Sequence, residues 1–137
     1  DYSKALGFNS NDIDLLMLRG DIKSKLQKFD EAIEDYSKVI KLNAKFSEAY
    51  FKRGKILFNS GKFDASIKDF SEIIKLNPKD GKAYHSRGLA KLKIKKKKDA
   101  CSDLKKAGDL GYFDAYEMIK KYCDPKKKLQ KKKDKIK

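Results

Sequence analysis

Residues 49–78 read AYFKRGKILFNSGKFDASIKDFSEIIKLNP, with apolar side chains at helical spacing on both sides of an Asn-Ser-Gly turn. This stretch predicts a helix, a tight turn and a second helix. Pro78 closes the unit, because proline disfavours helix at the residue before it. The pattern recurs, since each of the chain's three arginines precedes a glycine and they lie 34 residues apart, at Arg19, Arg53 and Arg87. A 34-residue period of helix pairs predicts an all-α solenoid.

The spacing within each unit resembles that of the tetratricopeptide repeat family. The family pattern has a bulky residue, glycine four positions later, alanine twelve positions after that glycine, an aromatic four later and proline after eight more. The three units place the following residues there, with few departures: Leu16, Gly20, Ala32, Tyr36 and Ala44; Tyr50, Gly54, Ser66, Phe70 and Pro78; Tyr84, Gly88, Ala100, Leu104 and Tyr112. The resemblance implies antiparallel helix pairs stacked in a right-handed superhelix, with the first helix of each pair lining the concave face.

The period also organises the ends of the chain. Residues 1–6, DYSKAL, match residues 35–40, DYSKVI, one period later, so the chain is interpreted as a fragment that begins inside an earlier repeat. The expected segments are, in order, a partial second helix at 1–12, repeats at 13–46, 47–80 and 81–112, a capping helix at 113–123, and a lysine-rich tail at 124–137 that is disordered or a fraying helix.

The net charge is +15, from 35 Lys and Arg against 20 Asp and Glu, and nearly half of it lies in the tail. Residues 126–137 hold eight lysines and one acid. A second basic patch, Lys95, Lys96, Lys97 and Lys98, lies in the third turn. These lysines could attract nucleic acid or an anionic membrane surface, or form a solvated linker. Specific nucleic-acid recognition is not expected, because the tail lacks arginines and aromatics. No apolar run approaches a membrane span.

The sequence offers no catalytic or cofactor motif. Cys101 and Cys123 show neither a disulfide framework nor metal-ligand spacing, which favours a reducing compartment and a cytoplasmic location. Cys101 shares its phase with Ile33 and Ile67, so it is expected to be a small core residue. The only histidine, His85, has no partner at catalytic spacing. We therefore predict no enzyme activity, no metal and no cofactor.

Aspartate recurs sixteen positions after each arginine. The spacing predicts buried or half-buried ion pairs, either within a repeat or between neighbouring repeats, and does not choose between them. The alternative is that these arginines bind a ligand phosphate. The expected pairs involve Arg19, Arg53 and Arg87 with Asp35, Asp69 and Asp103.

The resemblance implies that first-helix residues opposite the buried stripe face the concave groove. Two phenylalanines among them would give a partner large apolar contacts, and the surrounding lysines would favour an acidic or C-terminal-carboxylate peptide. Alternatively, the rings pack against their own neighbours and the lysines are solvated. The predicted groove residues are Met17, Asp21, Phe51, Lys52, Lys55, Phe58, Asn59, Lys82, His85, Ser86 and Leu89.

The predicted function is a protein-interaction scaffold, a co-chaperone-like adaptor that binds a protein or peptide. One subclass of the family clamps the terminal aspartate of chaperone tails. Lys82 fits that clamp, but other residues replace its members, so tail docking is not expected; the replacements are Met17, Asp21, Lys52 and Ser86. Two alternatives stay open. One is polyanion binding through Lys95–Lys98 and the tail, and the other is weak self-association through an apolar face of the first repeat.

Overall fold

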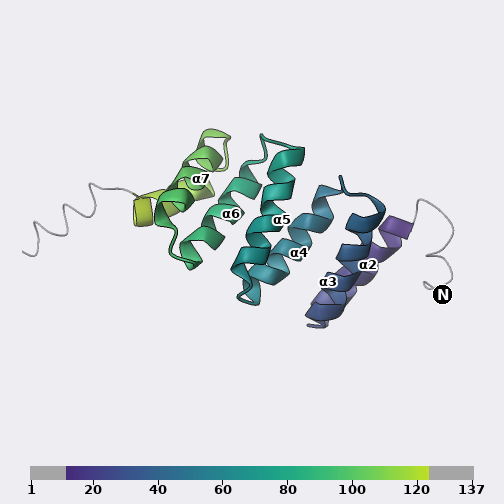
Figure 1. Ribbon diagram of the computed structural model, residues 1–137. Helices are drawn as coiled ribbons and strands as arrows, with labels where there is room; N and C mark the ends of the chain where they lie inside the picture. Colours follow the sequence, from purple (N-terminus) through teal and green to yellow (C-terminus); the bar gives the residue numbers. More distant parts are fainter. Residues whose placement is uncertain (1–11, 124–137) are drawn as a thin grey trace, which may run out of the picture. The chain divides into compact units, whose positions relative to one another are not determined.

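A computed structural model describes residues 12–123, and this part of the chain is entirely helical (Figure 1). Seven α-helices and a short π-helix occur there, without any strand, which confirms the predicted all-α class. The helix expected before the first repeat and the lysine-rich tail fall on residues 1–11 and 124–137, outside the described residues. The chain divides into two compact units after Leu76.

The first unit contains two helical hairpins. Its helices are α2 (Asp12–Lys25), α3 (Phe29–Leu42), α4 (Ser47–Asn59) and α5 (Phe63–Leu76). Helix α3 packs against both α2 and α4, and α4 packs against α5. Gly61 adopts a φ of 81°, which allows the tight turn into α5 at little steric cost. The buried core cluster that joins α2, α3 and α4 consists of Leu16, Met17, Ala32, Tyr36, Val39, Ala49 and Ile56.

Glycine in the first helix of each hairpin admits a large side chain from the second. A Cβ atom added at Gly20 would lie 2.7 Å from Tyr36 Cε1, and one added at Gly54 would lie 2.9 Å from Phe70 Cε1. Both rings are buried. The glycine and the aromatic sixteen positions later are therefore a matched pair that sets how closely the two helices approach.

The second unit consists of α6 (Gly81–Lys93), α7 (Lys97–Asp109), α8 (Asp114–Met118) and η1, a π-helix over Ile119–Cys123. Asp80 caps α6 by accepting a hydrogen bond from the Ala83 amide at 3.1 Å. Helices α8 and η1 both pack against α7. Their core is the buried cluster Leu104, Ala107 and Ala115.

The cysteines differ from expectation. Cys101 in α7 and Cys123 at the end of η1 form a disulfide, with Cα atoms 5.7 Å apart. Cys101 is half-buried rather than fully enclosed in a core. The prediction of two unpaired cysteines is wrong because a separation of 22 residues does not reveal that η1 folds back over α7.

Candidate functional site

Each arginine of the repeated Arg-Gly pair binds the aspartate of its own repeat. Each guanidinium donates two hydrogen bonds to its aspartate: Arg19 to Asp35 at 3.0 and 2.7 Å, Arg53 to Asp69 at 2.9 and 2.6 Å, and Arg87 to Asp103 at 2.8 and 2.8 Å. The aspartate side chains are buried, with 1%, 5% and 7% of their surface exposed. Their hydrogen bonds raise the arginine pKa values and keep these groups cationic. These arginines are engaged within the fold, which disfavours phosphate binding.

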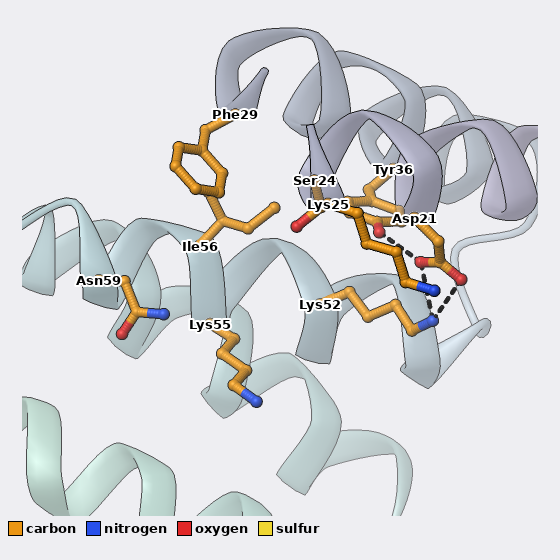
Figure 2. A pocket seen from close by; sticks show the side chains of 9 residues that line it. All are labelled: Asp21, Ser24, Lys25, Phe29, Tyr36, Lys52, Lys55, Ile56 and Asn59. Carbon is orange, nitrogen blue, oxygen red and sulfur yellow. Dashed lines mark hydrogen bonds and ion pairs between the residues drawn. The ribbon is translucent and has the colours of Figure 1, made fainter. Parts of the chain in front are cut away.

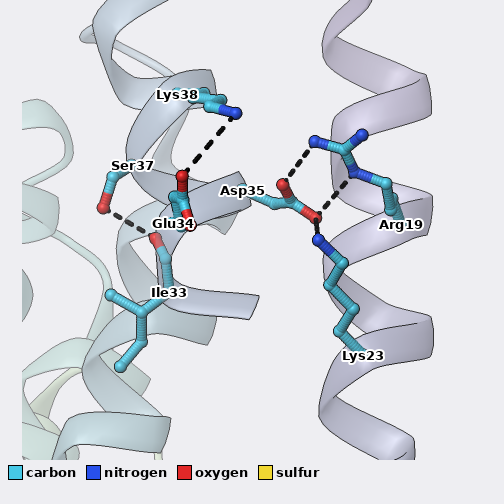
Figure 3. A network of polar contacts seen from close by, with 7 residues as sticks. All are labelled: Arg19, Lys23, Ile33, Glu34, Asp35, Ser37 and Lys38. Carbon is cyan, nitrogen blue, oxygen red and sulfur yellow. Dashed lines mark hydrogen bonds and ion pairs between the residues drawn. The ribbon is translucent and has the colours of Figure 1, made fainter. Parts of the chain in front are cut away.

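Lysines add to two of these pairs, a feature that was not predicted from the sequence. Lys23 lies 3.3 Å from Asp35 (Figure 3), and Lys91 lies 2.9 Å from Asp103. The two lysines occupy the same position of the repeat, four residues after the arginine. The second repeat has Leu57 at this position. This constant spacing between arginine and lysine is a sequence signal that could have predicted the two additional ion pairs.

A pocket of about 360 Å³ opens in the first unit, against helices α2, α3 and α4 (Figure 2). Most of its wall comes from the two first helices of the hairpins, α2 and α4. The start and middle of α3 supply two aromatic rings. The residues that line it are Asp21, Ser24, Lys25, Phe29, Tyr36, Lys52, Lys55, Ile56 and Asn59.

A polar network occupies one end of the pocket. Lys52 Nζ donates to both carboxylate oxygens of Asp21, at 2.8 and 2.7 Å, and the Tyr36 hydroxyl donates to the same carboxylate. Burial by itself would raise the pKa of Asp21, but the hydrogen bonds from Lys52 and Tyr36 outweigh burial and lower it. The carboxylate is therefore charged at neutral pH and holds α2 against α4.

The other end of the pocket is apolar and amide-lined. Figure 2 shows Phe29 and Ile56 close to one another, with Asn59 beyond them and the ammonium group of Lys55 directed away from Asp21. Phe29 has 41% of its surface exposed, whereas Ile56 is buried and belongs to the core. The pocket thus combines an apolar surface with lysines.

The structure brings four predicted groove residues together at this pocket, namely Asp21, Lys52, Lys55 and Asn59. Met17 is not one of them: its assignment to the groove is wrong, because it is 7% exposed and belongs to the core. Five lining residues were not predicted from the sequence, namely Ser24, Lys25, Phe29, Tyr36 and Ile56.

The two predicted apolar anchors, Phe51 and Phe58, are half-buried and pack within their own repeat. The Phe51 ring lies 6.0 Å from Phe70, and the Phe58 ring lies 5.3 Å from Phe63, in an edge-to-face arrangement. Neither is among the strongly exposed apolar side chains of the described residues. The structure thus favours the alternative in which these rings pack against their neighbours.

The remaining groove residues lie on α6, in the second unit. Lys82 is exposed, and Ser86 and Leu89 are half-buried. His85 lies 4.9 Å from the Tyr112 ring, and its burial lowers its pKa even though the Asp114 charge opposes the shift. Lys95–Lys98, at the α6–α7 turn, are all exposed.

Two kinds of site are missing from residues 12–123. No group of three or more His, Cys, Asp or Glu side chains there could hold a metal ion. None of the helices in that range has the length and apolar character needed to cross a bilayer.

Comparisons with known proteins give a consistent picture of the fold. Residues 20–61 match the family described as TPR repeat, and residues 47–80 match the family described as tetratricopeptide repeat. No curated protein matches this chain in sequence.

Among solved structures, the chain is similar to the first TPR of Spaghetti (RPAP3) bound to the HSP90 peptide SRMEEVD. Identity is 27%, over 83% of this chain and 92% of that one, with a TM-score of 0.77. It is also similar to MamA, with 30% identity over 79% of this chain and 60% of that one and a TM-score of 0.74. YrrB, described as a TPR protein with an unusual peptide-binding site, shows 25% identity over 87% of this chain and a TM-score of 0.75. The chain spans less than two thirds of MamA and of YrrB, at 60% and 62% of their lengths.

Proposed function

The chain is a tetratricopeptide repeat protein, and we propose that it is a binding scaffold, not an enzyme, that holds an acidic peptide segment in the pocket of its first unit. The observation that carries this proposal is the pairing of an exposed aromatic ring with excess positive charge in one pocket. Peptide ligands in the descriptions of the Spaghetti and YrrB structures support a peptide as the class of partner.

The charges of the pocket favour carboxylates in the ligand. Lys25, Lys52 and Lys55 line it together with a single acid, Asp21, so two positive charges are in excess. Lys52 is engaged by Asp21, and its pKa is raised: burial would lower that pKa, but the hydrogen bond and charge of Asp21 outweigh burial. Lys25 and Lys55 are then the cations best placed to pair with a ligand carboxylate.

The apolar end of the pocket supplies the second recognition element. Phe29 offers an exposed ring in the same pocket lining as Ile56, and this apolar surface suits an aliphatic or aromatic side chain of the ligand. The Asn59 amide can both donate to and accept from a peptide backbone. The preferred ligand is therefore a short segment with one apolar residue next to acidic residues.

The proposal predicts that reversing one lysine charge in the pocket weakens peptide binding. Peptides selected on the full chain from a random library would be labelled, and their Kd values measured by fluorescence anisotropy. Lys55→Glu is expected to raise Kd by about tenfold or more, because it removes an attraction and adds a repulsion. Lys75→Glu is the matched control, since Lys75 is an exposed lysine of α5 outside the pocket, and it should leave Kd almost unchanged.

Two outcomes would contradict pocket binding. Selected peptides that bind Lys55→Glu as tightly as the unaltered chain would place the site elsewhere. Binding that disappears at high salt, and that is lost when Lys95–Lys98 are changed to glutamine, would support polyanion binding through the basic turn.

Self-association is a second candidate function, favoured by an exposed apolar stripe on α2. Leu18, Ile22 and Leu26 lie four positions apart and are 45%, 44% and 62% exposed. One period later, Ile56 is only 6% exposed, because α3 packs over α4. On α2, no helix among the described residues covers the corresponding face, which carries the apolar stripe. This face could therefore pack against a second copy of the chain.

This candidate predicts a concentration-dependent dimer in sedimentation velocity experiments. Ile22→Asp is expected to shift the chain to monomer, because burying a carboxylate in the stripe is unfavourable. Leu42→Asp, an equally drastic change at a 59% exposed position on α3, should leave the dimer fraction unchanged. A chain that remains monomeric at every concentration would exclude self-association.

A further inference from the structure

The disulfide between Cys101 and Cys123 ties the last described segment of the chain to α7. Cys101 is the fifth residue of α7, and Cys123 is the last residue of η1. Both residues are half-buried, and Cys123 lies at the edge of the core cluster of the second unit. A soluble thiol reductant can therefore approach this bond from solvent.

Apart from this bond, η1 is held on α7 by Ile119, which is half-buried and packs with Cys123 against the cluster of Leu104, Ala107 and Ala115. None of its five residues is buried, and Lys120, Lys121 and Tyr122 are exposed. η1 continues directly from α8 as a single π-helical turn, a rare form of helix. The disulfide is thus the covalent anchor of η1 and fixes its last residue, whereas its first residue, Ile119, is held by packing alone.

The preceding helix, α8, has independent anchors. Ala115 is completely buried against α7, and the Tyr116 hydroxyl donates to the Gly108 carbonyl at 3.2 Å. Loss of the disulfide should therefore leave α8 in place while η1 detaches. If η1 detaches while α8 stays in place, the disulfide anchors η1 alone. If the whole unit loosens, the disulfide stabilises the whole unit.

The sequence around Cys101 suits thiol–disulfide exchange. Lys97, Lys98 and Lys105 lie three or four positions away on α7, the spacing that brings side chains to one face of a helix. Positive charge close to a disulfide stabilises the thiolate that leaves when the bond is attacked. No acidic residue occupies an equivalent position three or four residues from Cys101.

We propose that Cys101 and Cys123 form a reducible latch that holds η1 on α7 and opens on reaction with a dithiol. A thiolate of the dithiol attacks one cysteine sulfur, forms a mixed disulfide and releases the other cysteine as a thiolate, which takes up a proton. The second thiol of the reductant then displaces the remaining cysteine. Two electrons pass from the dithiol to the protein, leaving two cysteine thiols on the protein and a cyclic disulfide in place of the dithiol.

Disulfides persist in oxidising compartments and are reduced in the cytosol. The cytoplasmic location predicted from the sequence stays a prediction, and it is one in which the latch would be open.

The test uses the full chain, purified without reductant and then treated with dithiothreitol. Maleimide labelling with intact-mass measurement should count no reactive thiol before treatment and two after it. Hydrogen exchange should then show amides of residues 119–123 exchanging about tenfold faster or more, while amides of α6 and of α2–α5 remain unchanged. The double variant Cys101→Ser, Cys123→Ser should show the reduced pattern without any reductant.

Three outcomes would overturn the proposal. Two reactive thiols in the untreated chain would mean that the bond does not form. Unchanged exchange at residues 119–123 after reduction would mean that it does not anchor η1. Amide exchange that becomes faster throughout α6 and α7 would mean that the bond stabilises the whole second unit and not η1 alone. If the double variant fails to fold, the treated natural chain still decides among these outcomes.

Discussion

Replacing Asp69 with alanine is expected to destabilise the fold by about 3 kcal/mol, near the lower end of the range for breaking a buried ion pair. The Asp69 side chain is 5% exposed and accepts two hydrogen bonds from Arg53. Without it, the half-buried guanidinium keeps only the Ser37 hydroxyl, at 3.0 Å, and the face of the Tyr50 ring. Urea unfolding followed by circular dichroism would measure the loss.

A surface ion pair on the same helix provides the control. Lys75 and Glu72 lie 3.2 Å apart with 74% and 44% of their side chains exposed. Glu72→Ala should cost about 0.2–1 kcal/mol, because solvent screens exposed charges. If Asp69→Ala and Glu72→Ala cost the same, the repeated arginine–aspartate pairs do not stabilise the hairpins.

The helical repeat was predictable because its signal is periodic. Three arginine–glycine pairs at one spacing, with matching apolar positions, indicate helix hairpins without knowledge of any contact. The same period identified the aspartates that bind the arginines. It could not tell pairs within a repeat from pairs between repeats, because every member recurs at the same interval.

The pocket was only partly predictable, because its lining comes from helices of both kinds. The groove prediction drew on first helices alone, so it included Asp21 and Lys52 but not Phe29 and Tyr36 of α3. Met17 was misassigned because the buried and outward stripes adjoin on α2, and tertiary packing decides on which side a boundary residue falls.

The disulfide left no periodic trace in the sequence. Cys101 occupies a phase that holds isoleucine in the other repeats, whereas Cys123 lies in the cap, where the period is shortened by two residues. Only the path of η1 over α7 brings the two sulfur atoms together. Contacts of this kind depend on the fold, so residue spacing alone does not predict them.

Replacing Phe70 with alanine is expected to cost about 3–5 kcal/mol, the range for removing a buried aromatic ring. Phe70 is 2% exposed, packs against Gly54 and lies 6.0 Å from the Phe51 ring. The space it leaves lies between α4 and α5, whose close approach is set by that glycine. Urea unfolding of the full chain would measure this cost.

Two further variants test whether the stability lost in Phe70→Ala depends on burial of the ring opposite glycine. Phe113→Ala removes the same ring from a position that is 71% exposed, so it should change stability by less than about 0.5 kcal/mol. Phe70→Leu should cost less than Phe70→Ala, because the third repeat places Leu104 in this phase against Gly88 and buries it completely. If alanine at position 70 were tolerated as well as alanine at position 113, the glycine–aromatic pair could not be what sets the approach of the helices. A graded loss from leucine to alanine would instead show that the hairpins require a large apolar side chain opposite the glycine, whether aromatic or not.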